Sequence, residues 1–137
     1  MDIRTATLDD LDEVVALWRE FGGPSRSTTR PDHVRALIER DPDALLLAMD
    51  DSRSIVGSLV VGWDGWRCHL YRLAVRSSDR RAGVASALVA HARTRARAVG
   101  ADRMDAMVHR DNFAAASFWE ALGFELQDDD GRWAVML

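Results

Sequence analysis

The sequence has no lysine, so each of its 18 basic side chains is an arginine. This absence excludes catalysis through a lysine Schiff base and nucleotide binding through a P-loop lysine. A single cysteine, Cys68, excludes an intrachain disulfide and fits a reducing compartment. No apolar run approaches the roughly 18 residues that span a membrane, and the acidic start "MDIRTATLDD" does not resemble a secretory signal. We therefore expect a cytoplasmic protein with no membrane contact.

Several common kinds of site also lack their sequence signals. The histidines do not have the spacing of metal ligands, and Cys68 and His69 are neighbours that a strand would point to opposite faces. The net charge of -4 argues against general nucleic-acid binding, which needs a basic face. The chain has neither a Gly-x-Gly-x-x-Gly fingerprint nor a Gly-x-Ser-x-Gly elbow. We expect no metal and no nucleic-acid partner.

The pattern of apolar residues predicts one α+β domain spanning residues 1–137. Strands are expected over 3–7, 44–50, 54–63, 68–75 and 103–109, with two more around the Asp-Gly turn in 124–137. Helices are expected from Thr7 to about residue 21, over 32–40, from about 84 to 99, and over 112–122. This order predicts a mixed sheet with helices on its faces.

The stretch "SDRRAGVASAL" at 78–88 joins a predicted strand to a predicted helix. A helix N-terminus offers unpaired N–H groups and the positive end of the helix dipole, and both attract phosphate. Gly83 and its small neighbours would let an anion reach the backbone, while Arg80 and Arg81 add positive charge. On its own the pattern fits a solvated helix start equally well.

A second motif, "DNFAAASFWEALGF" at 111–124, makes the first more specific. Arg80, Gly83 and Ala85 match the Arg/Gln-x-x-Gly-x-Gly/Ala core of the acetyl-CoA-binding motif in the GNAT superfamily of N-acetyltransferases. Asn112 and the "LGF" ending resemble that family's later motif, in the right order and spacing. From Leu73 to Phe124 the chain therefore resembles a small bacterial GNAT protein. The resemblance implies a mostly antiparallel mixed sheet with about four helices, in α/β/α layers.

The resemblance also implies acetyl-CoA as cosubstrate and a set of residues that would hold it. The diphosphate would lie on the backbone of Arg81, Ala82, Gly83, Val84 and Ala85, and Arg80 would add positive charge just outside it. Leu73, Ala74 and Val75 would pair with the pantetheine arm as an added strand would. The N–H of Val75 would face the thioester oxygen and stabilise its developing charge.

The later motif implies three further coenzyme contacts, at Asn112, Ala115 and Phe118. Asn112 would orient the coenzyme or the strand beside it, and it also fits a plain helix N-cap.

The proton donor for the leaving thiolate is open, because the family's usual tyrosine position holds Trp119, whose indole is not an acid. Ser117 and bound water are candidate donors. The chain's only tyrosine, Tyr71, lies on an earlier predicted strand and fits a sheet aromatic better than an acid.

The base is also open. Met107 occupies the position where protein-acetylating relatives often carry a glutamate. Asp105, two residues earlier on the same face of its strand, is one candidate. Asp64 and Glu20 are others, and deprotonation through water without one essential base is a further alternative.

The expected acceptor is a primary amine on a small metabolite, peptide or protein, attacked directly in a ternary complex. The segments "GGPSRSTTRPD", "GWDGW" and "QDDDG" would select it, and the acidic last one would suit a cation. The resemblance allows a homodimer. An acyl-CoA-binding regulatory module with little turnover is the alternative from another class, and a nucleotide-binding α/β domain is a third.

Overall fold

The computed structural model describes residues 1–23 and 28–137. The chain forms two compact units, Met1–Met107 and Val108–Leu137. Among the described residues, the first unit holds the whole sheet and three α-helices, and the second holds a fourth. The predicted α+β class, with a mixed and mostly antiparallel sheet, is confirmed.

The sheet has five strands in the order β1-β2-β3-β4-β5, the same as their order along the chain. They are β1 (Asp2–Thr5), β2 (Leu45–Met49), β3 (Ile55–Trp63), β4 (Cys68–Val75) and β5 (Met104–Ala106). The first four pair antiparallel, and β5 pairs parallel to β4. All of β2 and most of β3 are buried, as expected for central strands covered on both faces.

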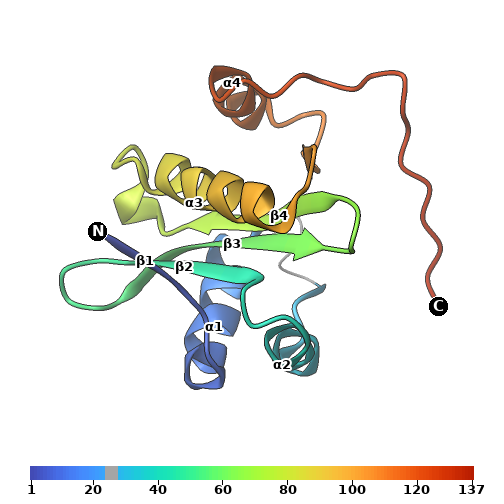
Figure 1. Ribbon diagram of the computed structural model, residues 1–137. Helices are drawn as coiled ribbons and strands as arrows, with labels where there is room; N and C mark the ends of the chain where they lie inside the picture. Colours follow the sequence, from blue (N-terminus) through green and yellow to red (C-terminus); the bar gives the residue numbers. More distant parts are fainter. Residues whose placement is uncertain (24–27) are drawn as a thin grey trace. The chain divides into compact units, whose positions relative to one another are not determined.

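Helices cover both faces of this sheet (Figure 1). On one face lie α1 (Leu11–Phe21) and α2 (Pro31–Arg40), and on the other lies α3 (Val84–Val99). Gly57 shows why β3 needs a glycine beneath α3, because a Cβ there would lie 2.7 Å from the side chain of Val84. The next residue, Ser58, points to the opposite face, where the Trp18 indole donates a hydrogen bond to it.

The C-terminal unit contains α4 (Phe113–Ala121), whose N-cap is Asn112. The indole of Trp119 packs edge-on against two rings, Phe118 at 5.1 Å and Phe124 at 4.8 Å between centroids. These contacts make Trp119 the centre of a small aromatic cluster. The predicted helix over 112–122 is confirmed: α4 begins one residue later, at Phe113, with Asn112 as its N-cap.

Two predictions about strands were wrong. The predicted strand over 103–109 is only Met104–Ala106, because its parallel pairing with β4 lasts three residues and a turn between His109 and Asn112 follows. The two strands expected in 124–137 do not form, although Trp133 and Val135 alternate as in a strand. Three successive like charges at 128–130 oppose a tight hairpin, and a two-stranded ribbon without further strands is marginal in water. Trp133 is 96% exposed.

Candidate active site

The start of α3 has the backbone geometry of an anion site. Gly83, its N-cap, has φ = 80°, and Arg81 has φ = 67°, so the chain turns twice through the left-handed region before the helix begins. The first helical N–H groups, from Val84 on, have no carbonyl one turn earlier to bond. A Cβ at Gly83 would meet no atom within 4 Å, so the backbone is open to a ligand at this point.

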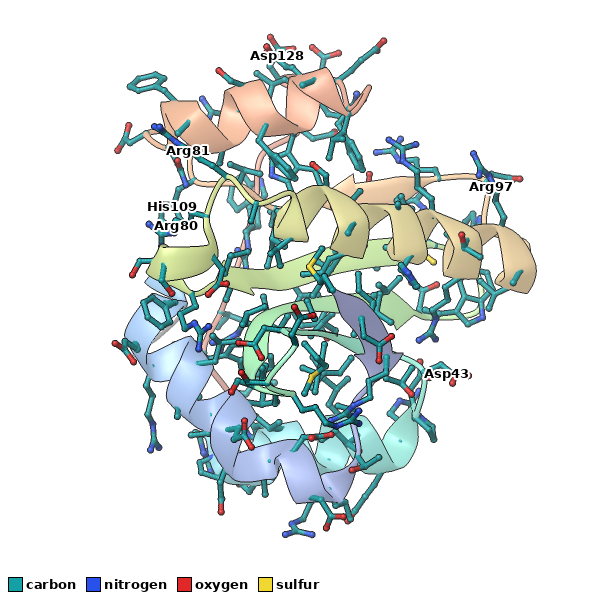
Figure 2. All side chains as sticks on the ribbon, turned by 90° about the vertical axis from the view of Figure 1, so that its left-hand side faces the viewer. Asp43, Arg80, Arg81, Arg97, His109 and Asp128 are labelled. Atoms are coloured by element: carbon teal, nitrogen blue, oxygen red, sulfur yellow. The ribbon has the colours of Figure 1, made fainter. Side chains whose placement is uncertain are left out.

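Positive charge gathers at this same end of α3. Arg80 and Arg81 are exposed and project beside the helix start, whereas Arg97 lies at its far end (Figure 2). Among the described residues, neither Arg80 nor Arg81 forms an ion pair. The helix dipole adds a partial positive charge here.

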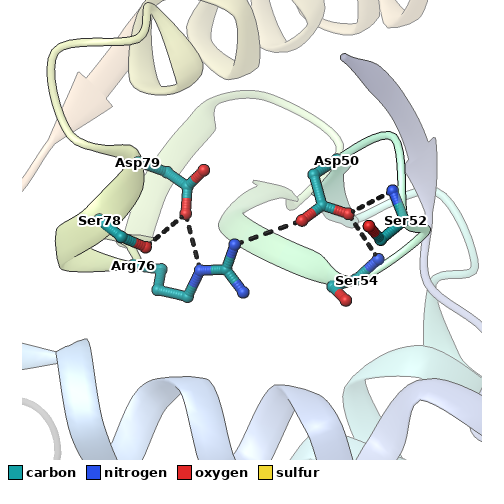
Figure 3. Close-up of polar contacts among 6 residues, drawn as sticks. All are labelled: Asp50, Ser52, Ser54, Arg76, Ser78 and Asp79. Carbon is teal, nitrogen blue, oxygen red and sulfur yellow. Dashed lines mark hydrogen bonds and ion pairs between the residues drawn. The ribbon is translucent and has the colours of Figure 1, made fainter.

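The acid closest in sequence, Asp79, is held by a different arginine (Figure 3). Its carboxylate accepts hydrogen bonds from Arg76 Nε at 2.7 Å and from the hydroxyl of Ser78 at 3.0 Å. Arg76 in turn reaches Asp50 at 3.3 Å, in the turn between β2 and β3. The Arg76 guanidinium lowers the pKa of Asp79, so Asp79 remains an anion paired to Arg76. This network braces the loop and leaves the charge of Arg80 and Arg81 for another partner.

One edge of β4 is open beyond the end of β5. The two strands pair only over Cys68–Leu70, while β4 continues to Val75. Arg76 N–H donates to the Val56 carbonyl at 2.8 Å, so these two residues form a hydrogen-bonded pair. Because such pairs alternate along an antiparallel ladder, the next pair, Val75 and Gly57, is a non-hydrogen-bonded one. The N–H and C=O of Val75 therefore point away from β3, toward the open edge. Those of Ala74 point toward β3.

A bulge in β4 fixes a second N–H in the same direction. Arg72 has φ = 55°, and the register between β3 and β4 shifts there. The hydroxyl of buried Ser58 donates to the Arg72 carbonyl at 2.9 Å and accepts from Trp18 Nε1 at 2.8 Å. Because C=O and N–H point in opposite directions across a trans peptide, the N–H of Leu73 points away from Ser58. No pattern in the sequence indicates these two hydrogen bonds of Ser58.

Two of the candidate bases, Asp64 and Asp105, are already engaged in other interactions. Asp64 accepts from the N–H groups of Trp66 and Arg67 at 2.8 and 2.7 Å, and these bonds lower its pKa and make it a turn former. Asp105 accepts from Arg103 Nε at 2.8 Å. His69, which sequence reasoning set aside, lies between the two acids, with 3.5 Å from Nε2 to Asp64 and 4.0 Å from Nδ1 to Asp105.

Other predicted residues have structural surroundings of their own. The side chain of Asn112 accepts from Ala115 N–H at 3.1 Å, so it caps α4 as one of the two interpretations predicted. Ser117 is exposed on the same helix, and Trp119 is held in its aromatic cluster. Of "GGPSRSTTRPD", residues 24–27 lie outside the described residues.

Metal-binding clusters and membrane-spanning helices are both absent from the part of the chain that the structure describes. No three histidine, cysteine or acidic side chains gather closely enough to hold a metal ion. No described helix has both the length and the apolar character needed to cross a bilayer.

Comparison with known proteins gives the family. Residues 11–124 match the model of the acetyltransferase (GNAT) family. The acetyltransferase SG1711 of Sodalis glossinidius is 34% identical over 134 residues, which cover 93% of this chain and 89% of that protein. A transcriptional regulator from Bacillus halodurans C-125 superposes with a TM-score of 0.82 at 25% identity, covering 98% and 99% of the two chains.

A structure of AAC(6')-Iy, solved with the bisubstrate analog CoA-S-monomethyl-acetylneamine, has the same fold, with a TM-score of 0.76 at 21% identity and coverage of 99% and 98%. The left-handed turns and open backbone at the start of α3, the open edge of β4 and these similarities agree with one another. The chain belongs to the acetyltransferase (GNAT) family.

Proposed function

We propose that this acetyltransferase transfers the acetyl group of acetyl-CoA directly to a primary amine on a small metabolite, peptide or protein. The observation that carries the proposal is the open backbone at Gly83, which a long helix follows directly. Two arginines that form no ion pair among the described residues lie just before it. This arrangement suits a diphosphate, and the family uses acetyl-CoA. The family match over residues 11–124 crosses the boundary between the two units, which supports one catalytic domain over 1–137.

In this proposal, residues of α3 and β4 bind the coenzyme at two places. The N–H groups of Gly83, Val84 and Ala85 donate hydrogen bonds to the diphosphate, with Arg80 and Arg81 outside it. The outward N–H and C=O groups of β4 then bond the pantetheine arm through Leu73 and Val75, as an added strand would. When bound, acetyl-CoA supplies an activated acetyl group as a thioester. In the C-terminal unit, Asn112, Ala115 and Phe118 remain proposed contacts.

The outward N–H groups of β4 are the proposed oxyanion donors. As the neutral amine attacks, negative charge develops on the carbonyl oxygen, and a donor fixed in advance lowers the barrier. Val75 was expected from the sequence. Leu73 lies on the same edge, and its peptide plane is held by the hydrogen bond from Ser58 to Arg72. We therefore assign this stabilisation to both, with Leu73 the more rigidly held.

Proton transfers in this scheme pass through water. The amine loses its proton to solvent near His69 and Asp105, which share one face of the β4–β5 edge. Trp119 has no acidic proton to give. Because the coenzyme thiol has a pKa of about 8.5, its thiolate leaves either unaided or with a proton from water or Ser117.

A thiol-release assay with acetyl-CoA and a panel of primary amines tests this function. Turnover of any amine, with a mass shift of one acetyl group on its nitrogen, would support it. Calorimetry on the same protein measures coenzyme binding separately. Tight binding of acetyl-CoA without turnover over a broad panel would contradict the proposal and favour a regulatory acyl-CoA-binding module.

A further inference from the structure

A pocket of about 160 Å³ lies on the α1/α2 side of the sheet, beside the bulge in β4. Its walls come from α1, the first turns of α2 and β4, and the side chains that matter most are those of Trp18, Arg30, His33, Tyr71 and Arg72. Arg72 is the residue directly before Leu73, whose N–H faces the proposed thioester. The pocket therefore adjoins the proposed reaction centre on the face opposite α3.

The walls of this pocket carry positive charge and no negative charge. Among the described residues, no aspartate or glutamate lines it. Arg30 is neutralised in part by Asp32 at 2.8 Å, but Arg72 has no carboxylate partner among the described residues. The first turn of α2 adds the positive end of a ten-residue helix, whose N-cap makes no side-chain capping bond.

Arg72 is held in place before any ligand arrives. Its Nη1 donates to Thr29 Oγ1 at 2.8 Å and its Nη2 to Thr28 Oγ1 at 3.2 Å, so two of its five N–H donors are used. The guanidinium lies 4.7 Å above the centre of the Trp18 ring. Burial lowers the pKa of Arg72, yet an arginine stays charged at any physiological pH. The remaining donors form a rigid fork that suits a carboxylate.

Tyr71 adds a neutral donor beside this fork. Burial raises the pKa of its hydroxyl, so the group keeps its proton at neutral pH and donates a hydrogen bond. The volume of the pocket is close to that of a cavity of ~150 Å³ that admits benzene, so it holds a group of amino-acid size. Large polycationic acceptors are opposed by both its size and its charge.

We propose that this pocket binds a carboxylate of the acceptor, so that the enzyme acetylates amino-acid-sized primary amines that also carry a carboxylate. This inference rests on the proposed function, because it places the acceptor amine next to the thioester. It differs from the expectation of a cationic acceptor drawn from Asp128–Asp130, which lie in the C-terminal unit. Arg72 is the specificity-determining residue.

The test compares acceptors that differ only in charge. Steady-state kinetics would use ω-amino acids of increasing chain length and the matching ω-amino amides, which keep the shape and the amine. A charge-assisted hydrogen bond predicts a kcat/KM preference for the acid of about 10-fold or more. Arg72→Met should remove the preference and Arg72→Lys should keep part of it. Arg35→Met, on the same α2 helix but outside the pocket, should leave it intact.

A binding experiment separates this inference from the proposed function. Calorimetry with the N-acetylated acids and their amides needs no turnover and uses the wild-type protein. Tighter binding of the acid, by about 10-fold, supports the pocket even if no acceptor is acetylated. Equal binding of acid and amide, or faster acetylation of amides and diamines than of acids, would overturn it.

Discussion

Replacing Ser58 with alanine tests how the oxyanion donor is held. The side chain is fully buried between two partners, accepting from the Trp18 indole at 2.8 Å and donating to the Arg72 carbonyl at 2.9 Å. Ser58→Ala removes both bonds without adding volume. It therefore releases the Arg72–Leu73 peptide while leaving the diphosphate site at Gly83 unchanged.

The size of the effect follows from these two bonds. Each buried polar group left without a partner costs about 1–3 kcal/mol, so the variant should lose about 2–6 kcal/mol of unfolding free energy. Complete loss of one oxyanion donor costs about 10²–10³ in kcat. Because the Leu73 N–H is loosened rather than removed, we expect kcat to fall by at least about 10-fold.

Urea denaturation and initial-rate kinetics, measured below the unfolding transition, would give both quantities. Val89→Ala is the matched control, since it removes buried volume from α3 at a cost of about 2 kcal/mol, away from the Ser58 bonds. It should keep its kcat. If Ser58→Ala were destabilised as expected but turned over at the wild-type rate, the proposed role of the Leu73 N–H would be refuted.

Three other substitutions address the coenzyme site, the base and acid stability. Gly83→Glu should abolish acetyl-CoA binding in calorimetry. The control, Gly100→Glu, lies at the other end of α3 with a similar φ of 85°, so it carries the same backbone strain and should bind acetyl-CoA normally. Unchanged affinity of the Gly83→Glu variant would contradict the site. Asp105→Asn should lower kcat by less than about 10-fold if water relays the proton, and a hundredfold loss would identify an essential base. Asp10 has its pKa lowered by the two hydrogen bonds from Arg4, so its stabilisation is present above the ordinary carboxyl pKa and is lost as the pH falls through the lowered value. Asp10→Asn should therefore cost about 1–2 kcal/mol at pH 7 and nothing in strong acid; a deficit that persists in acid would exclude the ion pair as its cause.

The sequence predicted the elements whose signals are local. Gly83 before an alanine-rich helix, and Asn112 before another, are cap signals that depend on a few neighbouring residues, and both helices form where expected. Prediction from local pattern was wrong at the C-terminus, where two strands were expected. Alternation at Trp133 and Val135 satisfied the strand pattern, but a strand also needs a partner, and residues 125–137 form no strand.

Family membership was also readable from the sequence, because it depends on two short motifs in a fixed order. In the proposed site, their residues bind through backbone groups at helix and strand ends, and small side chains there leave a recognisable pattern. No such pattern marks Ser58 or Arg72. A buried serine and a charged residue within a strand are ordinary in a sequence, and their roles arise only from what surrounds them.

Tertiary structure decided the parts of the site that join distant segments. Trp18 reaches Ser58 across 40 positions, and Thr29 reaches Arg72 across 43, because α1 and the segment before α2 pack on the same face of the sheet. The left-handed turn at Arg72 is set by the bulge in β4, not by any preference of arginine. The sequence by itself predicted a coenzyme diphosphate at Gly83. Which acceptor belongs beside Leu73 depends on charges that only packing brings together.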